Sequence, residues 1–316
     1  PYNWRESLRP GNVSLIVQSG ALAGGFLMQV LGEGYFGISK ACSLGNRADV
    51  NECDILEHLT GDPHTQVVAM YLESLADPPR FRRAVERLGR PVVLLKGGLS
   101  QEGARAALSH TGSLAGDAAI GEGFFRQLGL HRAHDFVEMM DLAKALSLWQ
   151  GRRGGPRTAV MTWSGGAGIV NSDHLAAQGL TLARLAPATQ ERLRRVYPPW
   201  MEPGNPADIW PAIERNGWLQ AQRETLAALL DDPGVDAVQV HYFVRPDVLA
   251  QAAQHLAPAA ESSKPVVVWA AGSSPLFGQL RRLVEPLGCP VYSEIGRGVK
   301  ALSLLARSQG LMGRPG

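Results

Sequence analysis

The sequence predicts an α/β fold made of two tandem domains, each a doubly wound parallel sheet covered by helices on both faces. From residue 11 onward, short β-branched runs alternate with longer amphipathic segments, which is the pattern of repeated strand–helix units. A polar, glycine-rich segment at residues 151–156 interrupts this alternation, which then starts again. A chain of 316 residues with 45% hydrophobic side chains is long enough for two domains with separate cores.

The first predicted domain comprises residues 1–150. Strands are expected at residues 13–17, 36–42, 66–72 and 91–95, where β-branched and apolar residues run together. Residues 49–60 and 79–88 space their apolar side chains three and four apart and therefore predict helices. A further helical stretch ends near Gln150 and is followed by the helix-breaking run Gly151-Arg-Arg-Gly-Gly-Pro156. We expect the domain boundary there.

The second predicted domain comprises residues 151–316. It begins with a strand at 157–162 and a helix at 168–178, and further strands are expected at 180–183, 235–241 and 265–270. Both domains open with a strand that runs into a Ser-Gly turn and a helix, at Gln18-Ser-Gly-Ala21 and at Trp163-Ser-Gly-Gly-Ala-Gly168. Each also has an Asn followed three residues later by an Asp, namely Asn46 with Asp49 and Asn205 with Asp208. These shared features indicate two related domains.

Composition excludes several classes of protein. The 31 basic and 29 acidic residues are interleaved along the chain, so no field of one sign is available for nucleic acid or an anionic membrane. No apolar run approaches the roughly 20 residues that cross a bilayer, and no signal peptide is recognisable. The odd set of Cys42, Cys53 and Cys289 fits a reduced compartment, so we expect a soluble, cytoplasmic protein. Neither the cysteines nor the histidines show metal-ligand spacing, and no metal site is expected.

The two Ser-Gly turns are candidate phosphate-binding sites. A turn between a strand and a helix leaves the first N–H groups of the helix unpaired, and together with the helix dipole they attract an anion. The alternative is that the glycines only cap their helices, because neither turn matches a dinucleotide-binding or P-loop pattern. The candidate residues are Gln18, Ser19, Gly20 and Ala21 in the first domain and Ser164, Gly165, Gly166, Ala167 and Gly168 in the second.

A histidine and a glutamate are the candidate chemical groups. His110 lies in the stretch Ser109-His-Thr-Gly-Ser-Leu-Ala-Gly116, which follows the strand at 91–95 through an expected loop. Ligands bind at the carboxyl edge of such sheets, and neutral imidazole is a competent nucleophile toward phosphorus. Glu73 follows the strand at 66–72 at the same edge, where a carboxylate can orient an imidazole ring. Lys96 follows the next strand. The alternatives are a hydrogen-bonding loop histidine, a carboxylate at a helix N-terminus and a solvated lysine.

Several motifs in one order carry a family resemblance. They are Gly11-Asn-Val-Ser-Leu-Ile-Val-Gln-Ser-Gly-Ala-Leu22, Gly45-Asn-Arg-Ala-Asp49, Tyr71-Leu-Glu73, Leu95-Lys-Gly-Gly98, Ser109-His-Thr-Gly-Ser-Leu-Ala-Gly116, Ser164-Gly-Gly-Ala-Gly-Ile169 and Gly204-Asn-Pro-Ala-Asp-Ile209. In these motifs the chain resembles the acyl-CoA synthetases that form a nucleoside diphosphate, relatives of succinyl-CoA synthetase. The resemblance implies two flavodoxin-like domains and covers most of the chain.

The resemblance also implies roles for individual residues. The family's phosphorylated histidine corresponds to His110, and the glutamate beside it corresponds to Glu73. The helices that point their N-termini at the phosphohistidine correspond to the turns at residues 18–21 and 164–168. Ala167 stands where many relatives have proline. Supporting positions around these groups are Lys96, Ser109, Thr111, Gly112, Asn46, Asp49, Asn205 and Asp208.

The implied reaction joins a small carboxylic acid to CoA at the expense of ATP, releasing ADP and inorganic phosphate, with Mg²⁺ accompanying the nucleotide. The family's CoA-binding and ATP-grasp domains have no counterpart here, and the chain opens with Pro1. We therefore expect a piece of a longer protein, or a subunit with a partner, that is inactive alone. The acid, the choice between ATP and GTP, and assembly into a homo-oligomer stay open.

Two other functions compete with this reading. One is a non-catalytic regulatory module of the same architecture, as in synthetase-like protein lysine acetyltransferases of bacteria, where the phosphorylated histidine is typically lost. The other is a ligand-sensing pair of flavodoxin-like domains outside the family. The presence of His110, Glu73 and both turns favours the enzyme.

Overall fold

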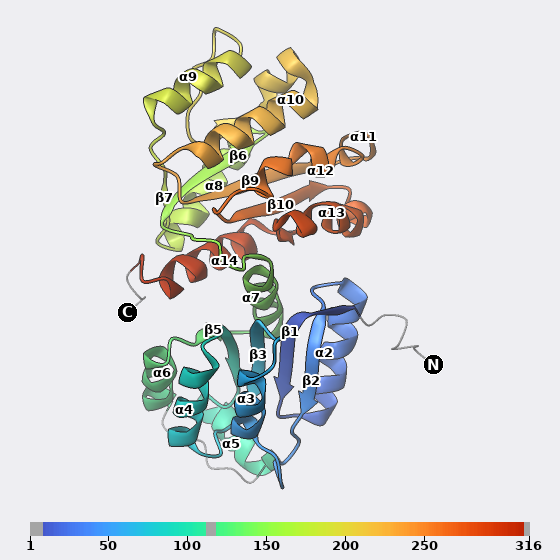
Figure 1. The fold of residues 1–316 in the computed structure, drawn as a ribbon, viewed down its shortest axis with the longest axis vertical. Helices are drawn as coiled ribbons and strands as arrows, with labels where there is room; N and C mark the ends of the chain where they lie inside the picture. Colours follow the sequence, from blue (N-terminus) through green and yellow to red (C-terminus); the bar gives the residue numbers. More distant parts are fainter. Residues whose placement is uncertain (1–8, 112–117, 313–316) are drawn as a thin grey trace. The chain divides into compact units, whose positions relative to one another are not determined.

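The computed structural model describes residues 9–111 and 118–312. The chain divides into two compact units, Pro1–Ser147 and Leu148–Gly316, which are called unit 1 and unit 2 below. Each unit contains one sheet of parallel strands surrounded by helices (Figure 1). The predicted α/β fold with two doubly wound parallel sheets is therefore confirmed. The predicted domain limits, 1–150 and 151–316, stay a prediction.

Unit 1 has a sheet with the strand order β2-β1-β3-β4-β5. Its strands are β1 (Pro10–Val17), β2 (Ile38–Ser43), β3 (Val67–Leu72), β4 (Val92–Lys96) and β5 (His131–Ala133). The helices of this part of the chain are α2 (Gly20–Glu33), α3 (Glu52–Thr60), α4 (Pro78–Leu88), α5 (Gln101–Thr111), α6 (Ala118–Gln127) and α7 (Phe136–Leu148).

Local signals in the sequence explain where these helices begin and end. Asn51 and Asp54 form a capping box at the start of α3, in which each side chain accepts a backbone N–H of the helix start. Asp77 caps α4 in the same way, by accepting from the N–H of Arg80 at 2.9 Å. Gly34 and Gly89 end α2 and α4 in the left-handed conformation, which glycine adopts without strain.

Helices cover both faces of the unit 1 sheet. Helices α3, α4 and α6 pack on one face through buried side chains that include Leu56, Phe81 and Phe125. Helices α2 and α7 pack on the other face, where the rings of Phe26 and Phe136 lie 4.5 Å apart and that of Phe136 lies 5.7 Å from Tyr71. Because successive residues of a strand point to opposite faces of the sheet, each strand contributes side chains to the helix layers on both faces.

The prediction of a loop before His110 was wrong. Residues 101–111 form helix α5, which begins five residues after β4 ends at Lys96. This segment is rich in Ala, Gln, Glu, Arg and Leu, which are good helix formers. Ser100 precedes the helix and caps it, because its hydroxyl oxygen accepts from the N–H of Gly103 at 2.9 Å. The glycines and serines that suggested a loop thus lie at the start of the helix and near its end.

Unit 2 has a sheet with the strand order β11-β10-β9-β6-β7, and β8 also pairs with β6. The strands are β6 (Arg157–Thr162), β7 (Thr181–Leu182), β8 (Ala207–Asp208), β9 (Ala237–Val244), β10 (Val266–Gly272) and β11 (Val291–Tyr292). The α-helices are α8 (Gly165–Ala177), α9 (Pro187–Val196), α10 (Trp210–Asp231), α11 (Pro246–Leu249), α12 (Ala252–His255), α13 (Phe277–Val284) and α14 (Ile295–Ser308). Short 3₁₀ helices are η1 (Ala257–Ala259), η2 (Ser274–Leu276) and η3 (Glu285–Leu287).

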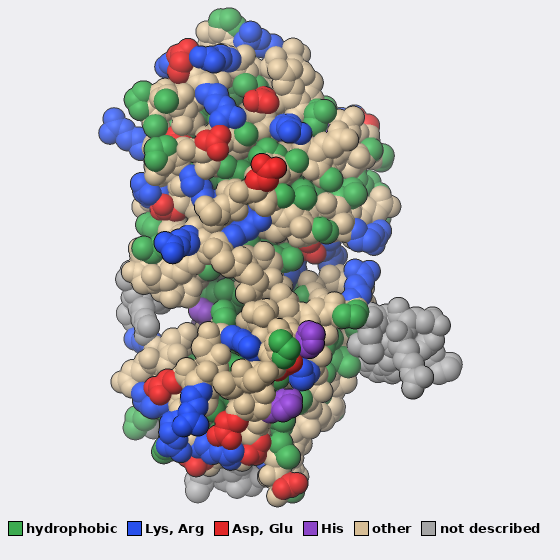
Figure 2. Space-filling model, viewed as in Figure 1, with side chains coloured by type: hydrophobic (Ala, Val, Ile, Leu, Met, Phe, Trp, Pro, Cys, Tyr) green, Lys and Arg blue, Asp and Glu red, His purple; other side chains and the backbone are tan. Residues whose placement is uncertain are grey.

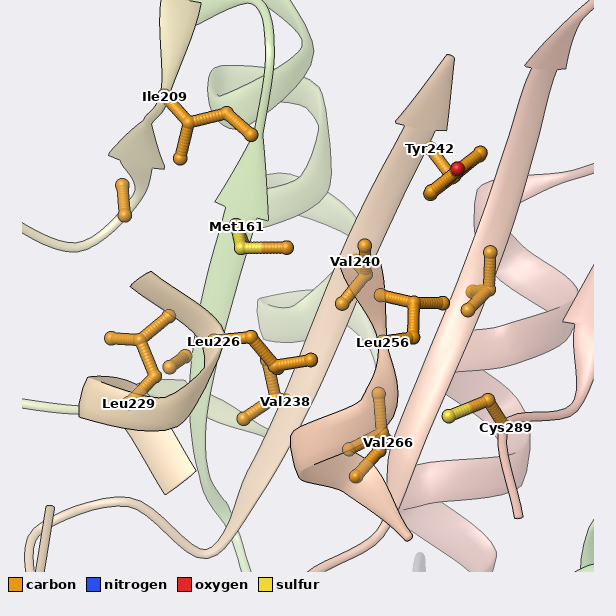
Figure 3. Packing of buried hydrophobic residues seen from close by; sticks show 14 of the residues in the cluster. Met161, Ile209, Leu226, Leu229, Val238, Val240, Tyr242, Leu256, Val266 and Cys289 are labelled. Carbon is orange, nitrogen blue, oxygen red and sulfur yellow. The ribbon is translucent and has the colours of Figure 1, made fainter. Parts of the chain in front are cut away.

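The core of unit 2 lies between its sheet and α10 to α13. Figure 3 shows Met161 of β6 and Val240 of β9 pointing into the same layer as Leu226 of α10. On the opposite face, the Gln239 amide of β9 donates a hydrogen bond of 2.7 Å to Asn171 of α8. Helix α14 packs beside α8 on that face, and this second layer completes the doubly wound arrangement.

The surface carries both signs of charge close together. Figure 2 shows basic and acidic side chains interspersed on the visible face. In unit 1, for example, Arg80 pairs with Asp54 and with Glu57 at 2.6 Å in each case. Within residues 9–111 and 118–312, no helix combines the length and the apolar character that crossing a membrane requires.

Candidate functional site

The sheet of unit 1 brings several predicted site residues to one edge. Val17 of β1 lies opposite Tyr71 of β3, and Leu72 of β3 lies opposite Lys96 of β4. Because the strands are parallel, their carboxyl ends meet at this edge. Gln18, Glu73 and Lys96 therefore lie close together, as the sequence predicted.

Helix α2 begins at the same edge. Ser19 is its N-cap in an extended conformation, and its hydroxyl oxygen accepts from the N–H of Leu22 at 3.5 Å. The first N–H groups of the helix have no partner within it, and they carry the positive end of the helix dipole. A Cβ added at Gly20 would lie 3.7 Å from the Ser43 hydroxyl at the end of β2. Unpaired N–H groups and small neighbouring side chains at a helix start are the features that a phosphate site requires.

Glu73 presents a carboxylate with one oxygen unused. Its residue is only 9% exposed, and the Tyr71 hydroxyl donates to Oε1 at 3.4 Å. Oε2 is buried and has no hydrogen-bond partner among the described residues. A buried carboxylate oxygen without a partner is costly, by about 1–3 kcal/mol or more. Glu73 is therefore an acceptor ready for an N–H or O–H donor.

Lys96 is a cation bound to the turn that carries Glu73. Its ammonium donates to the carbonyl oxygen of Glu73 at 2.5 Å and also to that of Gly97. Burial, aided by the positive charge of Arg132, lowers the pKa of Lys96 to about 8. Burial also raises the pKa of Tyr71 to about 12, and the adjacent Glu73 charge acts in the same direction. Tyr71 is thus a neutral donor to Glu73.

His110 lies in the last turn of α5. The structure describes the backbone of Ser109, His110 and Thr111 but not their side chains, and Gly112 lies outside the described residues. Helix α5 crosses back over the turn after β4, because a Cβ added at Gly98 would lie 3.5 Å from that of Ala107. His110 follows Ala107 by three residues, a rise of roughly 4.5 Å along the helix. The middle of α5 thus lies against the turn after β4, and His110 follows one turn further along the helix.

Unit 2 repeats the strand, Ser-Gly turn and helix. Ser164 is the extended N-cap of α8, and its side chain makes no capping hydrogen bond. Instead the Thr162 hydroxyl accepts from the N–H of Ser164 at 3.1 Å and lies 3.0 Å from Nδ1 of His241. His241 is 4% exposed, and burial lowers its pKa to about 3, so the ring is neutral.

The Asn205–Asp208 segment packs against the start of α8. The Asn205 amide oxygen accepts from the N–H of Val160 at 2.8 Å, and its NH₂ donates to the carbonyls of Thr158 and Ala183 at 3.0 Å. Asn205 therefore joins the strand β6 to its neighbour. A Cβ added at Gly165 would lie 3.2 Å from a carboxylate oxygen of Asp208, so the acidic side chain flanks the helix start.

Other predicted residues lie apart from these contacts. Asn46 and Asp49 are exposed in the loop that follows β2. Between them, Arg47 adopts a left-handed conformation and binds Ser74 and Glu52, a role that sequence reasoning missed. The Gly45-Asn-Arg motif could have drawn attention to Arg47, but the motif was read for its Asn. Within the described part of the chain, no group of three or more His, Cys, Asp or Glu side chains could hold a metal ion. The site assignments stay predictions.

Both units match known domain families. Residues 10–146 match the succinyl-CoA ligase-like flavodoxin domain, and residues 158–280 match the ligase-CoA domain. Among solved structures, the chain is similar to the dinucleotide-forming acetyl-coenzyme A synthetase 1 of Candidatus Korarchaeum cryptofilum in complex with phosphate and ADP. That match has a TM-score of 0.83 and 32% sequence identity, and covers 96% of this chain and 66% of the other.

Curated relatives show the same likeness. The acetate–CoA ligase (ADP-forming) II of Archaeoglobus fulgidus is 29% identical over 302 residues, which is 95% of this chain and 45% of the relative. The alpha subunit of acetate–CoA ligase (ADP-forming) II of Pyrococcus furiosus is 34% identical over 293 residues, covering 90% of this chain and 62% of that subunit. The chain thus spans about half the length of these relatives.

Proposed function

Because the chain belongs to the family of ADP-forming acyl-CoA synthetases, we propose that it carries the phosphoryl-transfer part of such an enzyme. The overall reaction joins a small carboxylic acid to CoA and converts ATP to ADP and inorganic phosphate. The observation that carries this proposal is the Glu73 carboxylate, which is buried at the carboxyl edge of unit 1 with one oxygen unused beside the start of α2. A buried acceptor of this kind is suited to an imidazole N–H.

The proposed reaction has three steps. An imidazole nitrogen of His110 attacks the γ-phosphorus of ATP, and the bond from phosphorus to the β,γ-bridging oxygen breaks to release ADP. A carboxylate oxygen of the acid then attacks the same phosphorus, and the phosphorus–nitrogen bond breaks to give an acyl phosphate and free His110. Finally the CoA thiolate attacks the acyl carbon, and the carbon–oxygen bond to phosphate breaks to give the thioester and inorganic phosphate.

The described residues have distinct proposed roles in this sequence. Glu73 accepts the N–H of the His110 ring, which fixes the tautomer and stabilises the ring when it carries phosphate. The N-terminus of α2 supplies backbone N–H groups to the transferred phosphate, and its dipole contributes about 0.3–2 kcal/mol. The N-terminus of α8 is a second, weaker candidate phosphate site in unit 2, because Asp208 flanks it. Thr111, Ser109 and Gly112 belong to the same proposed histidine segment.

The remaining components are proposed to bind elsewhere. The matched domains at residues 10–146 and 158–280 are the flavodoxin-like and ligase-CoA domains, and the relative from Pyrococcus furiosus is described as an alpha subunit. We propose that further domains or a partner subunit bind Mg²⁺–ATP and CoA, and that this part is inactive without them.

Phosphate on His110 tests the proposal directly. The complete protein is incubated with ATP and magnesium, kept alkaline to preserve acid-labile phosphate, and its peptides are analysed by mass spectrometry. We expect one phosphate on the His110 peptide, which ADP, or acid together with CoA, discharges, and no phosphate in His110→Asn. An unphosphorylated wild-type protein with a folded nucleotide-binding part would overturn the enzyme proposal and favour the regulatory module.

A further inference from the structure

The turn that carries Glu73 is held almost entirely by side chains. Gln18 Oε1 accepts from the backbone N–H of Glu73 at 2.8 Å and from that of Ser74 at 3.3 Å. Lys96 donates to the carbonyl of Glu73 at 2.5 Å. Arg47 donates to the carbonyl of Ser74 at 2.9 Å and to its hydroxyl at 2.5 Å. The N–H and carbonyl groups of both residues are therefore satisfied without regular secondary structure.

The same support extends into α3. Glu52 is completely buried and accepts from the N–H of Ala76 at 2.6 Å with one carboxylate oxygen. Its other oxygen accepts from Arg47 at 3.2 Å. Gln18 comes from the end of β1, Arg47 from the loop after β2, Glu52 from the first turn of α3, and Lys96 from the end of β4. We call these four residues the Glu73 clamp.

The clamp binds the backbone of Glu73 and leaves part of its carboxylate free. Oε2 of Glu73 has no partner among the described residues, whereas the peptide groups around it are bonded by buried or half-buried side chains, namely the neutral Gln18 and the charged Arg47, Glu52 and Lys96. Burying Arg47 with Glu52, and half-burying Lys96, costs desolvation energy that a solvated turn would not incur. Rigid support of this kind is typical of a side chain whose position matters for chemistry.

Unit 2 shows that the shared frame does not need the clamp. Ile16 of β1 pairs with Met70, and Met161 of β6 pairs with Val240 at the corresponding position before the Ser-Gly turn. In this register the position of Gln18 is taken by Trp163, that of Glu73 by Phe243 and that of Lys96 by Ala270. The ring centroids of Trp163 and Phe243 lie 4.4 Å apart, with the rings tilted by 30°. Both units therefore share the strand, Ser-Gly turn and helix, but the clamp residues occur in the unit that also carries the Glu73 carboxylate.

We propose that Gln18, Arg47, Glu52 and Lys96 are positioning residues that fix the Glu73 turn, so that the free carboxylate oxygen is placed for the phosphoryl-carrying histidine. This inference rests on the proposed function. It also changes the role expected for Gln18, whose side-chain oxygen is committed to the Glu73 and Ser74 amides rather than to phosphate. Lys96 acts through the same turn and not as a phosphate ligand.

Lys96→Met tests the clamp, and Lys264→Met is its matched control. Lys264 is also half-buried, and its ammonium also donates to a backbone carbonyl at 2.5 Å, that of Asp232, but it precedes β10 at the opposite edge of the other sheet. In the complete protein, the rate of His110 phosphorylation is measured at a series of ATP concentrations, together with thermal unfolding. Lys96→Arg and Gln18→Met are measured in parallel.

We expect Lys96→Met to lower the maximal rate of His110 phosphorylation about 10- to 100-fold and to leave the KM for ATP unchanged. Lys264→Met should retain the wild-type rate after a similar loss of thermal stability, and Lys96→Arg should recover most of the rate because it keeps a charged donor. Gln18→Met should show the same loss of rate as Lys96→Met. If Lys96→Met does not fold, the rate of Gln18→Met tests the clamp. Wild-type rates in both Lys96→Met and Gln18→Met would overturn the clamp alone. A wild-type protein that takes no phosphate would overturn the proposed function as well.

Discussion

Replacing Glu73 by Gln removes the charge of the carboxylate while keeping its shape. The amide can still accept from the Tyr71 hydroxyl, which lies 3.4 Å from Oε1. At the position of the free Oε2, however, it presents an NH₂ group, which donates where the proposed partner needs an acceptor. A hydrogen bond to a charged group contributes about 1.5–3 kcal/mol. Since 1.4 kcal/mol corresponds to a factor of ten, the rate of His110 phosphorylation should fall about 10- to 100-fold.

The assay follows the appearance of alkali-stable, acid-labile phosphate on the complete protein after rapid mixing with ATP. Glu86→Gln is a suitable control, because Glu86 is an exposed residue of α4 with a weak ion pair to Arg82 at 4.0 Å. It makes the same chemical change away from the carboxyl edge of the sheet. The reasoning is refuted if Glu73→Gln is phosphorylated as fast as Glu86→Gln and wild type.

Other predictions concern stability and anion binding. Burial lowers the pKa of His131 to about 4, below its unfolded value of about 6.5, so the unfolded state alone gains this proton as the pH falls through that window. Lowering the pH from 7.5 to 5 should therefore reduce the free energy of unfolding by about 2 kcal/mol. In urea unfolding, His131→Phe should lose about 2 kcal/mol less than wild type over this pH range, whereas a substitution of exposed His134 should lose as much as wild type. Gly272 has φ of 120°, and an added Cβ would lie 2.5 Å from a carbonyl oxygen of β9. Gly272→Ala should therefore cost roughly 2–4 kcal/mol. Gly278→Ala in α13, where an added Cβ meets only the Arg282 side chain at 3.8 Å, should change thermal unfolding little. Asp208→Asn removes a negative charge beside α8 and should raise the affinity for inorganic phosphate about five-fold in calorimetric titrations; an unchanged affinity would contradict this charge effect.

Much of the fold follows from local patterns in the sequence. The strands β3, β4 and β10 are nearly continuous apolar runs, and β1, β6 and β9 are rich in β-branched and apolar residues, so the sequence leaves little choice of assignment. The structure of the segment before His110 was harder to predict, because residues such as Gly97, Gly98 and Ser100 occur both in loops and at capped helix starts. The two-residue strands β7, β8 and β11 exist only through pairing with a neighbouring strand, so their limits depend on tertiary structure.

In the candidate site, the positions of residues could be predicted from the sequence, but their side-chain contacts could not. Glu73, Gln18 and Lys96 could be placed at one edge from the sequence, because each follows directly on or ends a recognisable strand. What each side chain does there could not be predicted, since Gln18 binds backbone amides and Arg47 reaches the turn from a loop. The contact between Arg47 and Ser74 joins residues 27 positions apart in the chain, and no local pattern reports it.

The two helix starts are unequal as anion sites, although their sequences look alike. At α2 the neighbouring side chain is the neutral Ser43 hydroxyl, 3.7 Å from where a Cβ at Gly20 would lie. At α8 the neighbour is the Asp208 carboxylate, which already offsets the positive end of the dipole and would repel a phosphate. Among the residues that the structure describes, only the start of α2 has a buried carboxylate oxygen without a partner beside it, on Glu73, together with a cation, Lys96, bound to the Glu73 turn. The start of α8 therefore admits an anion only at a cost that the start of α2 does not impose.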